Sequence, residues 1–411
     1  MPIVVQKFGG TSVATADRVR TAAQRSIATQ KDGNQVVVVV SAQGQMTDEL
    51  IAMGREISPH PPRRELDVLI STGEQISIAL FAMAVHEMGH KAISFTAAQV
   101  GILTDSSHTR ARILKVKADR ILEELNNGNI VIVAGFQGVD EKNNITTLGR
   151  GGSDTTAVAL AAALKADLCE IYTDVDGVFT ADPRIVPAAR RLAVISHDEM
   201  MEMASLGAGV LHLRSVEFAK NFNVKLVVRS SLNDREGTLV CEETPAMERV
   251  MVRGCAISKE EALISVEHVP SKPGALPKFF EALADNGINI DMIVQSARGK
   301  NSTDVSFTVN RDDLFDAVQL TKQVAKSVGA QRVTSNRGVA KVSVVGIGMR
   351  SQPGVAAKVF GTLGRKNIRM YMITTSEIKI SCLVDEEKGE EALKAIHEAF
   401  KLGKTSGDLV R

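Results

Sequence analysis

Three glycine-rich loops contain the residues best suited to chemistry, and their composition indicates phosphate binding. The first loop, KFGGTS at residues 7–12, lies between a β-branched run and a helical stretch. Glycines let the backbone approach a ligand closely, and the following helix N-terminus offers N–H donors with partial positive charge. Lys7 adds a point charge that can face phosphoryl oxygens. An ordinary tight strand–helix turn would also explain a lone Gly-Gly pair, so both interpretations stay open for this loop.

The second loop, TLGRGGSDTT at residues 147–156, opens an alanine-rich helical stretch. Arg150 lies among three glycines, which leave room for a small anion, and its planar guanidinium suits a carboxylate. Ser153 or Asp154 could instead serve only to cap the helix. The loop therefore indicates a carboxylate site beside a helix N-terminus.

The third loop, TDVDGVFTADPR at residues 173–184, follows a short apolar run. Its aspartates could indicate calcium, but their spacing does not fit the calcium-loop pattern, and Asp-Gly and Asp-Pro also favour turns. No G-x-G-x-x-G follows a strand, which disfavours a dinucleotide-dependent dehydrogenase. Gly403-Lys404-Thr405 imitates the end of a Walker A motif, but Glu398 stands where glycine is required, so we interpret this match as accidental.

Alternating strands and helices must position these loops in the first half of the chain. Short Val/Ile-rich runs predict strands at 3–6, 35–40, 91–95, 130–134 and 168–173. Longer amphipathic or alanine-rich stretches predict helices around 16–31, 47–57, 66–89, 111–125 and 154–166. This alternation predicts an α/β domain with a mostly parallel sheet between helices, and ligands bind such sheets at the carboxyl ends of the strands.

The second half of the chain contains an internal repeat at an offset of 80 residues. A polar, turn-rich stretch at 233–249 suggests a domain boundary before it. The shared residues are Ser271, Pro273, Gly274, Lys278, Phe280, Leu283, Ile288, Met292 and Ile293, which recur as Ser351, Pro353, Gly354, Lys358, Phe360, Leu363, Ile368, Met372 and Ile373. The repeat predicts two copies of a small α+β unit packed side by side.

Composition excludes several classes of function. The 411 residues include 49 Lys+Arg and 48 Asp+Glu, a balance that argues against nucleic-acid and membrane-surface binding. The four cysteines form no C-x-x-C pair, which excludes a zinc ribbon and gives no disulfide framework. The N-terminus has no signal-peptide pattern, and no apolar run reaches the ~18 residues of a membrane span. We therefore expect a cytoplasmic protein.

Five motifs in this order resemble those of aspartate kinases in the amino-acid-kinase superfamily. They are KFGGTSV at 7–13, SAQGQMTDEL at 41–50, STGEQ at 71–75, TLGRGGSDTTA at 147–157 and YTDVDGVFTADPR at 172–184. The tandem repeat resembles the paired ACT regulatory domains of that family. The resemblance implies a kinase domain at 1–245 and two ferredoxin-like ACT domains at 250–335 and 336–411. No dehydrogenase fingerprint follows before Arg411, so we expect a monofunctional enzyme.

The activity that the resemblance implies is ATP- and Mg²⁺-dependent phosphorylation of the side-chain carboxylate of L-aspartate to 4-phospho-L-aspartate. This reaction is the first step toward lysine, threonine and methionine, and the resemblance implies feedback by lysine or threonine and homo-oligomers formed through the ACT domains. An aspartate carboxylate is already ionised at neutral pH and needs no general base. It needs relief from charge repulsion, by Mg²⁺ and Lys7, together with in-line positioning.

The resemblance also assigns roles to individual residues. Lys7 and Asp154 are implied to be catalytic. The implied ATP-binding residues are Lys7, Phe8, Gly9, Gly10, Ser12, Ser41, Thr173, Asp174, Phe179, Asp182 and Arg184. The implied aspartate-binding residues are Thr47, Glu74, Arg150, Gly151 and Ser153, with Arg150 on a substrate carboxylate and Glu74 near its ammonium. The implied effector-binding residues are Ser271, Pro273, Gly274, Asp291, Gln295, Ser376 and Glu377.

Two positions depart from the family pattern. Gln43 stands where Met is usual, and Ser271 stands where Asp is usual in the first ACT loop, which leaves the identity of the effector open. Alternatives are a sister kinase acting on another carboxylate, a carbamate or a phosphate, and a non-catalytic amino-acid sensor with a kinase-like domain. The sensor hypothesis requires the loss of a residue such as Lys7 or Asp174, and both are present.

Overall fold

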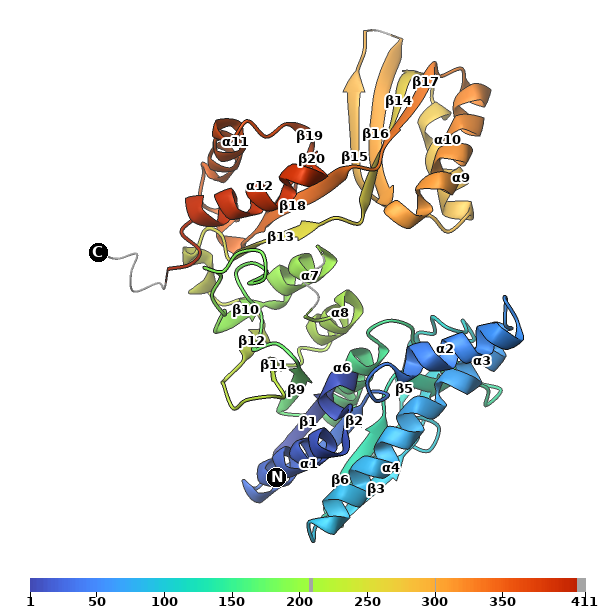
Figure 1. Ribbon diagram of the computed structural model, residues 1–411, viewed down its shortest axis with the longest axis vertical. Helices are drawn as coiled ribbons and strands as arrows, with labels where there is room; N and C mark the ends of the chain where they lie inside the picture. The colour runs from blue at the N-terminus through green and yellow to red at the C-terminus, as the bar shows by residue number, and fades with distance from the viewer. Residues whose placement is uncertain (207–209, 300, 405–411) are drawn as a thin grey trace. The chain divides into compact units, whose positions relative to one another are not determined.

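The computed structural model describes residues 1–206, 210–299 and 301–404, which form two compact units (Figure 1). The first unit contains residues 1–178, 191–205 and 210–244. The second contains residues 179–190 and 206 together with the described residues from 245 onward. Residues 179–190 thus pack with the C-terminal unit, although they belong to the first half of the sequence.

An eight-stranded sheet in the order β10-β12-β11-β9-β1-β2-β6-β3 forms the centre of the first unit. Its strands are β1 (Ile3–Phe8), β2 (Gln35–Val40), β3 (Ala92–Phe95), β6 (Ile130–Ala134), β9 (Leu168–Thr173), β10 (Val194–Ser196), β11 (Leu226–Ser230) and β12 (Thr238–Cys241). All neighbours pair in parallel except β11 and β12. Strands β2 and β6 are almost wholly buried because helices cover both faces of the sheet, which explains their unbroken apolar sequences. The five predicted strands are confirmed.

The helices of the first unit are α1 (Ala16–Lys31), α2 (Met46–Ile57), α3 (Arg63–Ile70), α4 (Thr72–Glu87), α5 (Asp119–Asn126), α6 (Gly152–Leu164), α7 (His197–Ser205) and α8 (Leu213–Asn221). Helices α1 and α4 share one hydrophobic cluster with β1, β2 and β6, and α6 packs against β1 outside that cluster. Among the described residues, only the segment Arg63–Glu87 is long and apolar enough to cross a membrane. Half of its most apolar window is buried, with Phe81 and Val85 in the core, so packing accounts for its composition.

The prediction of a helix over 111–125 is wrong in its first half. Residues Ile113–Val116 form β5, and α5 begins only at Asp119. Strand β5 belongs to a small sheet in the order β5-β4-β7-β8, with β4 (Ile102–Thr104), β7 (Gln137–Val139) and β8 (Ile145–Thr147). Pairing with β4 supplies backbone partners that a local pattern does not reveal, and tertiary context overrides helix propensity here. The predicted helix 66–89 is likewise two helices, α3 and α4, that meet at Ser71.

The second unit contains two four-stranded sheets with their helices. The first repeat comprises β14 (Glu261–Pro270), α9 (Ala275–Asp285), β15 (Ile290–Ala297), β16 (Ser302–Asn310), α10 (Leu314–Val328) and β17 (Arg332–Asn336). The second comprises β18 (Val339–Val345), α11 (Val355–Arg365), β19 (Met370–Thr375), β20 (Lys379–Asp385) and α12 (Glu386–Ala399). The sheet orders are β15-β16-β14-β17 and β13-β18-β20-β19, with β13 at Gly254–Ser258. Strand β13 precedes the first repeat in sequence, and the predicted boundaries place it there, but it pairs with β18 in the second repeat.

Candidate active site

Lys7 and Asp154 form an ion pair at the carboxyl end of the central strand. Lys7 is the penultimate residue of β1, and Asp154 lies in the first turn of α6. Lys7 Nζ is 2.6 Å from Asp154 Oδ1, and both side chains are only about a tenth exposed (11% and 12%). The carboxylate holds the ammonium group in place while part of it stays accessible, which suits a cation that stabilises developing charge on a phosphoryl group.

The loop after β1 packs directly against the loop after β2. A Cβ at Gly10 would lie 2.7 Å from the carbonyl oxygen of Ala42, so only glycine fits there. The amide of Gly44 donates to the carbonyl of Gly10 (3.1 Å), and the amide of Ser41 donates to the carbonyl of Phe8 (3.1 Å). Both loops contain residues that the family resemblance implies for phosphate binding, and the fold brings these two loops together.

The Ser12 hydroxyl donates to Ser231 Oγ at 2.8 Å, and Ser231 in turn donates through both its amide and its hydroxyl to the carbonyl of Thr173. Ser231 follows β11 and was missed by the sequence analysis. It connects the loop after β1 with the loop after β9, which contains Thr173 and Asp174. The phosphate loop and the first part of the predicted ATP segment are therefore linked through one buried serine.

Glu74 is a buried carboxylate, and one of its two oxygens has no hydrogen-bond partner among the described residues. It lies in the first turn of α4, is 2% exposed, and its Oε1 accepts from the amide of Ala42 at 3.1 Å. Among the described residues, Oε2 has no hydrogen-bond partner. Burial raises the pKa of Glu74 to about 7, although hydrogen bonds from the backbone amides of Ala42 and of Glu74 itself lower it. A buried carboxylate with a free oxygen is suited to receive a ligand ammonium group.

Arg150 lies on a glycine-rich turn that leads into α6. Gly149 and Gly151 have φ values of 76° and 71°, in the left-handed region that favours glycine. The side chain of Arg150 is exposed, and no carboxylate of the described residues lies within ion-pair distance of it. Ser153, two residues into the helix region, packs against Gly135, where a Cβ would come within 2.8 Å of its hydroxyl. The guanidinium is thus available to an external carboxylate.

The remaining predicted residues of the kinase half are less closely connected. Thr47 lies half-buried in the first turn of α2. The predicted ATP-binding residues Phe179, Asp182 and Arg184 belong to the second compact unit, where Arg184 Nη2 is 2.7 Å from Asp182 Oδ2. Thr173 and Asp174 belong to the first unit, so the predicted ATP segment is divided between the two.

The predicted effector residues lie on both repeats of the second unit. Ser271, Pro273 and Gly274 are exposed in the turn before α9, and Gln295 is exposed on β15. Asp291 forms an ion pair with Lys341 of the second repeat, a partner that the sequence analysis missed. Ser376 follows β19, where its amide donates to the carbonyl of Lys379, and Glu377 Oε2 lies 3.4 Å from Arg350 Nε.

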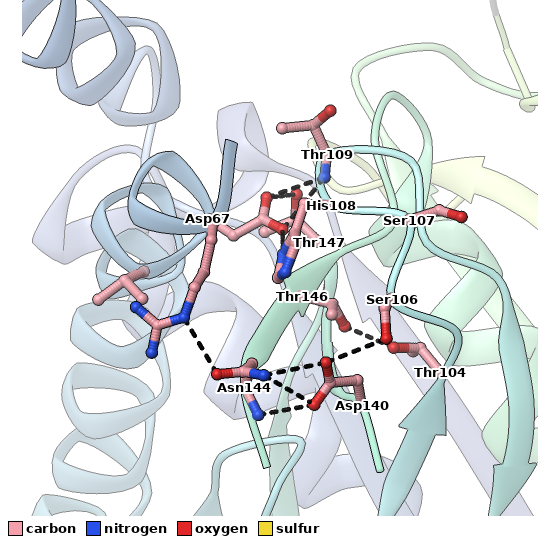
Figure 2. Close-up of polar contacts among 12 residues, drawn as sticks. Asp67, Thr104, Ser106, Ser107, His108, Thr109, Asp140, Asn144, Thr146 and Thr147 are labelled. Carbon is pink, nitrogen blue, oxygen red and sulfur yellow. Dashed lines mark hydrogen bonds and ion pairs between the residues drawn. The ribbon is translucent and has the colours of Figure 1, made fainter. Parts of the chain in front are cut away.

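A buried polar network near Arg150 also escaped the sequence analysis (Figure 2). Its centre is Asp67 on α3, which is 0% exposed and contacts His108, Thr109 and Thr147. The sequence does indicate it in one respect: Asp67 lies three residues before Ile70, on the same side of an amphipathic helix. A carboxylate on the buried side of a helix needs polar partners.

Comparison with known proteins gives a consistent result. The amino acid kinase family matches residues 2–230, and the ACT domain matches residues 264–323 and 342–400. An aspartokinase of Bacillus sp. (strain MGA3) is 51% identical over 411 residues, covering 100% of this chain and 99% of the relative. An aspartokinase of Geobacillus stearothermophilus is 52% identical over 402 residues, covering 98% of each chain.

Solved structures show the same relationship. The structure of E. coli aspartokinase III in complex with aspartate and ADP is 29% identical, with a TM-score of 0.81, and covers 97% of this chain and 99% of that one. The structure of the same enzyme with lysine and aspartate is 30% identical, with a TM-score of 0.76 and the same coverage. Both similarities extend over the kinase half and the ACT repeats.

Proposed function

This chain belongs to the aspartokinase family, a family of kinases regulated through ACT domains, and from that premise we propose that it transfers the γ-phosphoryl group of ATP to the side-chain carboxylate of L-aspartate. The observation that carries the proposal is the position of Ala42. Its carbonyl packs against Gly10 of the phosphate loop, and its amide binds Glu74, the proposed ammonium site. One residue thus connects the site for the donor with the site for the acceptor.

Four residues of the chain have separate roles in the proposed reaction. Lys7 stabilises the charge that develops on the transferring phosphoryl group, and Asp154 keeps its ammonium group in position. Glu74 binds the ammonium of aspartate, and Arg150 binds its α-carboxylate through the planar guanidinium fork. The attacking carboxylate is ionised at neutral pH, so binding has only to align it with the γ-phosphorus and overcome the repulsion between two anions.

Magnesium enters with the nucleotide as part of the substrate. Within the described residues, no group of three or more His, Cys, Asp or Glu side chains is arranged to hold a metal ion. Mg²⁺ in kinases is bound largely by phosphate oxygens and water with one or two carboxylates, so a site without a dedicated protein cage suits it. When bound with the nucleotide, the ion would supply positive charge beside the phosphate oxygens.

Substitution of Lys7 by Ala tests the catalytic assignment. We expect kcat to fall about a hundredfold or more, equivalent to about 3 kcal/mol, with a smaller effect on KM for ATP. Initial rates at saturating aspartate and ATP measure this effect. A variant with near-normal kcat would remove Lys7 from the mechanism.

Arg150→Lys tests the substrate assignment. The lysine keeps the charge and loses the fork, so KM for aspartate should rise sharply while KM for ATP barely changes. Equal changes in both constants would contradict the assignment.

The pKa of Glu74 gives an independent test by pH. Burial raises this pKa to about 7, so the carboxylate is mostly ionised, and able to bind an ammonium group, only at pH values above about 7. KM for aspartate should therefore rise as pH falls below 7, and Glu74→Gln should have a high KM without this pH dependence. A wild-type KM that is constant between pH 6 and 8 would contradict this role.

We further propose that lysine, threonine or both inhibit the enzyme through the turns before α9 and α11, in a cytoplasmic homo-oligomer formed through the ACT repeats. The support is the paired turns with Gly274 and Gly354 at helix N-termini, whose free N–H groups suit a carboxylate. A relative has been solved with bound lysine. Ser271 should weaken recognition of a cationic effector, so Ser271→Asp should strengthen inhibition by lysine. Titration with both amino acids to millimolar levels without change in rate would contradict the regulatory proposal.

A further inference from the structure

Asp67 accepts hydrogen bonds from two segments that are distant in sequence. Its Oδ2 lies 2.7 Å from His108 Nδ1, its Oδ1 accepts from the hydroxyl of Thr147 at 2.6 Å, and the amide of Thr109 is 3.1 Å from each oxygen (Figure 2). The Nδ1 atom of His108 faces a carboxylate oxygen, which accepts hydrogen bonds, so the tautomer with a proton on Nδ1 completes this contact. The carboxylate therefore joins α3 to the loop 105–111 and to β8.

These two segments support the turn that contains Arg150. Thr147 ends β8 three residues before Arg150, and its carbonyl accepts from the amide of Ala111 at 2.9 Å. A Cβ at Gly149 would come within 2.9 Å of the carbonyl of Thr109, so the loop lies directly against the turn. Both segments that Asp67 binds thus contact the base of the turn.

The helix of Asp67 also leads to Glu74. The amide of Ser71 donates to the carbonyl of Asp67 at 3.1 Å, and α4 begins at the next residue, with Glu74 in its first turn. Gln137 of β7 donates from its side chain to the carbonyl of Ser71 at 3.0 Å, which ties this junction to the small sheet. Asp67 is therefore connected on one side to the helix start that carries Glu74 and on the other to the turn that carries Arg150.

We infer that Asp67 is a positioning residue for aspartate binding, which holds the turn of Arg150 at a fixed place relative to Glu74. This inference rests on the proposed function of those two residues. A bidentate pair with a carboxylate depends on orientation, so a displaced turn would bind the carboxylate of aspartate less tightly. Loss of the Asp67 carboxylate would leave the donors of His108, Thr109 and the buried Thr147 without their acceptor and release the turn.

A neighbouring carboxylate offers a matched control. Asp140 is also buried (2% exposed) and directly follows β7 of the same small sheet. Its donors are the amides of Lys142 and Asn144 and the side chains of Asn144 and Ser106, so most of its bonds stay within residues 140–144. Replacing it removes a buried carboxylate of equal size without touching the contacts of Thr147 and Thr109.

The first experiment compares Asp67→Asn with Asp140→Asn in the full chain. We expect Asp67→Asn to raise KM for aspartate about tenfold or more, with KM for ATP and kcat changed by no more than about twofold. Asp140→Asn should leave KM for aspartate within about twofold of the wild-type value. Equal rises in KM for both substrates in Asp67→Asn, or equal effects of the two variants, would show a merely structural role and overturn the inference.

A second comparison remains informative if Asp67→Asn does not fold. The amide nitrogen of an asparagine side chain can take the place of His108 Nδ1, so His108→Asn should keep KM for aspartate near the wild-type value, whereas His108→Ala should raise it. Identical KM values for these two variants would overturn the inference. Arg150→Lys separates the two levels of the argument: if it raises KM for aspartate and the Asp67 and His108 variants do not, the inference fails and the proposed function stands. If Arg150→Lys leaves KM for aspartate unchanged, the proposed function of Arg150 fails, and the inference with it.

Discussion

The two ACT repeats share the order strand, helix, strand, strand, helix, but they are joined to the rest of the chain in different ways. The first repeat builds its sheet from the contiguous strands β14 to β17. The second takes β13 from ahead of the first repeat, and its hydrophobic core includes Ala181 and Val186 of the segment 179–190. That segment also contains Asp182 and Arg184, two of the proposed ATP-binding residues. The second repeat is therefore the copy whose folding directly supports part of the proposed nucleotide site.

The repeats also differ in charge at equivalent positions. Glu261 on β14 and Lys341 on β18 are 80 residues apart, so they occupy the same place in the two copies, and they bind each other. Lys341 Nζ is 2.6 Å from Glu261 Oε1 and also pairs with Asp291, and both Lys341 and Glu261 are buried. Apolar side chains of both repeats, among them Met292 and Met372, pack nearby. Two copies of one fold have thus become unequal partners, one contributing acids and the other a base.

The largest predicted effect comes from breaking this charge asymmetry. Lys341→Met leaves Glu261 buried without a counter-ion, so we expect the free energy of unfolding to fall by about 3–5 kcal/mol. Urea unfolding of the full chain followed by circular dichroism measures the change. The double variant Glu261→Leu with Lys341→Met should recover most of the loss, because it removes both charges. A single variant as stable as the wild type would show that the pair does not hold the repeats together.

The same pair predicts a dependence on alkaline pH. Burial lowers the pKa of Lys341, but Glu261 and Asp291 outweigh that effect, and the net pKa is raised above its ordinary value. A lysine with a raised pKa contributes its full stabilisation at pH values below the ordinary lysine pKa of about 10.4. This contribution is lost as the pH rises through the folded-state pKa. The stability difference between wild type and Lys341→Met should therefore shrink only above about pH 10. A difference that already shrinks between pH 7 and 9 would contradict this assignment.

Two equivalent core leucines allow the stability and the KM for ATP to be compared between the repeats. Leu283 and Leu363 are both completely buried, so each change to Ala should cost about 2–5 kcal/mol. Only Leu363 packs in the cluster that contains Ala181 and Val186, so only Leu363→Ala should also raise KM for ATP. Thermal unfolding and steady-state kinetics of both variants test this, and equal effects on KM for ATP would remove the proposed distinction.

Replacing the glycine by alanine in the turn before α9 or in the turn before α11 should lower the stability by similar amounts. Gly274 and Gly354 have φ values of 87° and 98°, and a Cβ at either would meet no atom within 4 Å. The cost of Gly→Ala is therefore backbone strain alone, about 1–2 kcal/mol in each repeat. Denaturation of the two variants measures it. A cost in one repeat only would mean that the turns are not equivalent.

The smallest predicted effect concerns the link between the segment 179–190 and α12. Thr180 Oγ1 and His397 Nε2 are buried and 3.0 Å apart. His397→Ala should raise KM for ATP about fivefold, equivalent to about 1 kcal/mol for one lost hydrogen bond. His397→Gln places an amide nitrogen where Nε2 lies and should restore much of the affinity. Equal KM values in both variants would show that this bond does not position the segment.

Features that depend on neighbouring residues follow from the amino-acid sequence alone. Apolar runs such as 35–40 and 130–134 predict strands because burial on both faces demands unbroken apolar sequence, and the structure confirms them. The family and the two repeats could likewise be predicted from local motifs and the offset of 80 residues, and the comparisons confirm both. The roles assigned to Lys7, Glu74 and Arg150 stay predictions, but the strand end, helix start and turn on which they lie follow from local pattern.

Features that depend on partners far away in sequence follow only from the fold. Residues Ile113–Val116 form a strand because they pair with β4. Strand β13 belongs to the sheet of the second repeat because it pairs with β18. Asp67 finds its donors about 40 and 80 residues away, and Lys341 finds Glu261 at 80 residues. A buried charge in a sequence shows that a partner must exist, since burial without one is costly, but only the fold decides which residue that partner is.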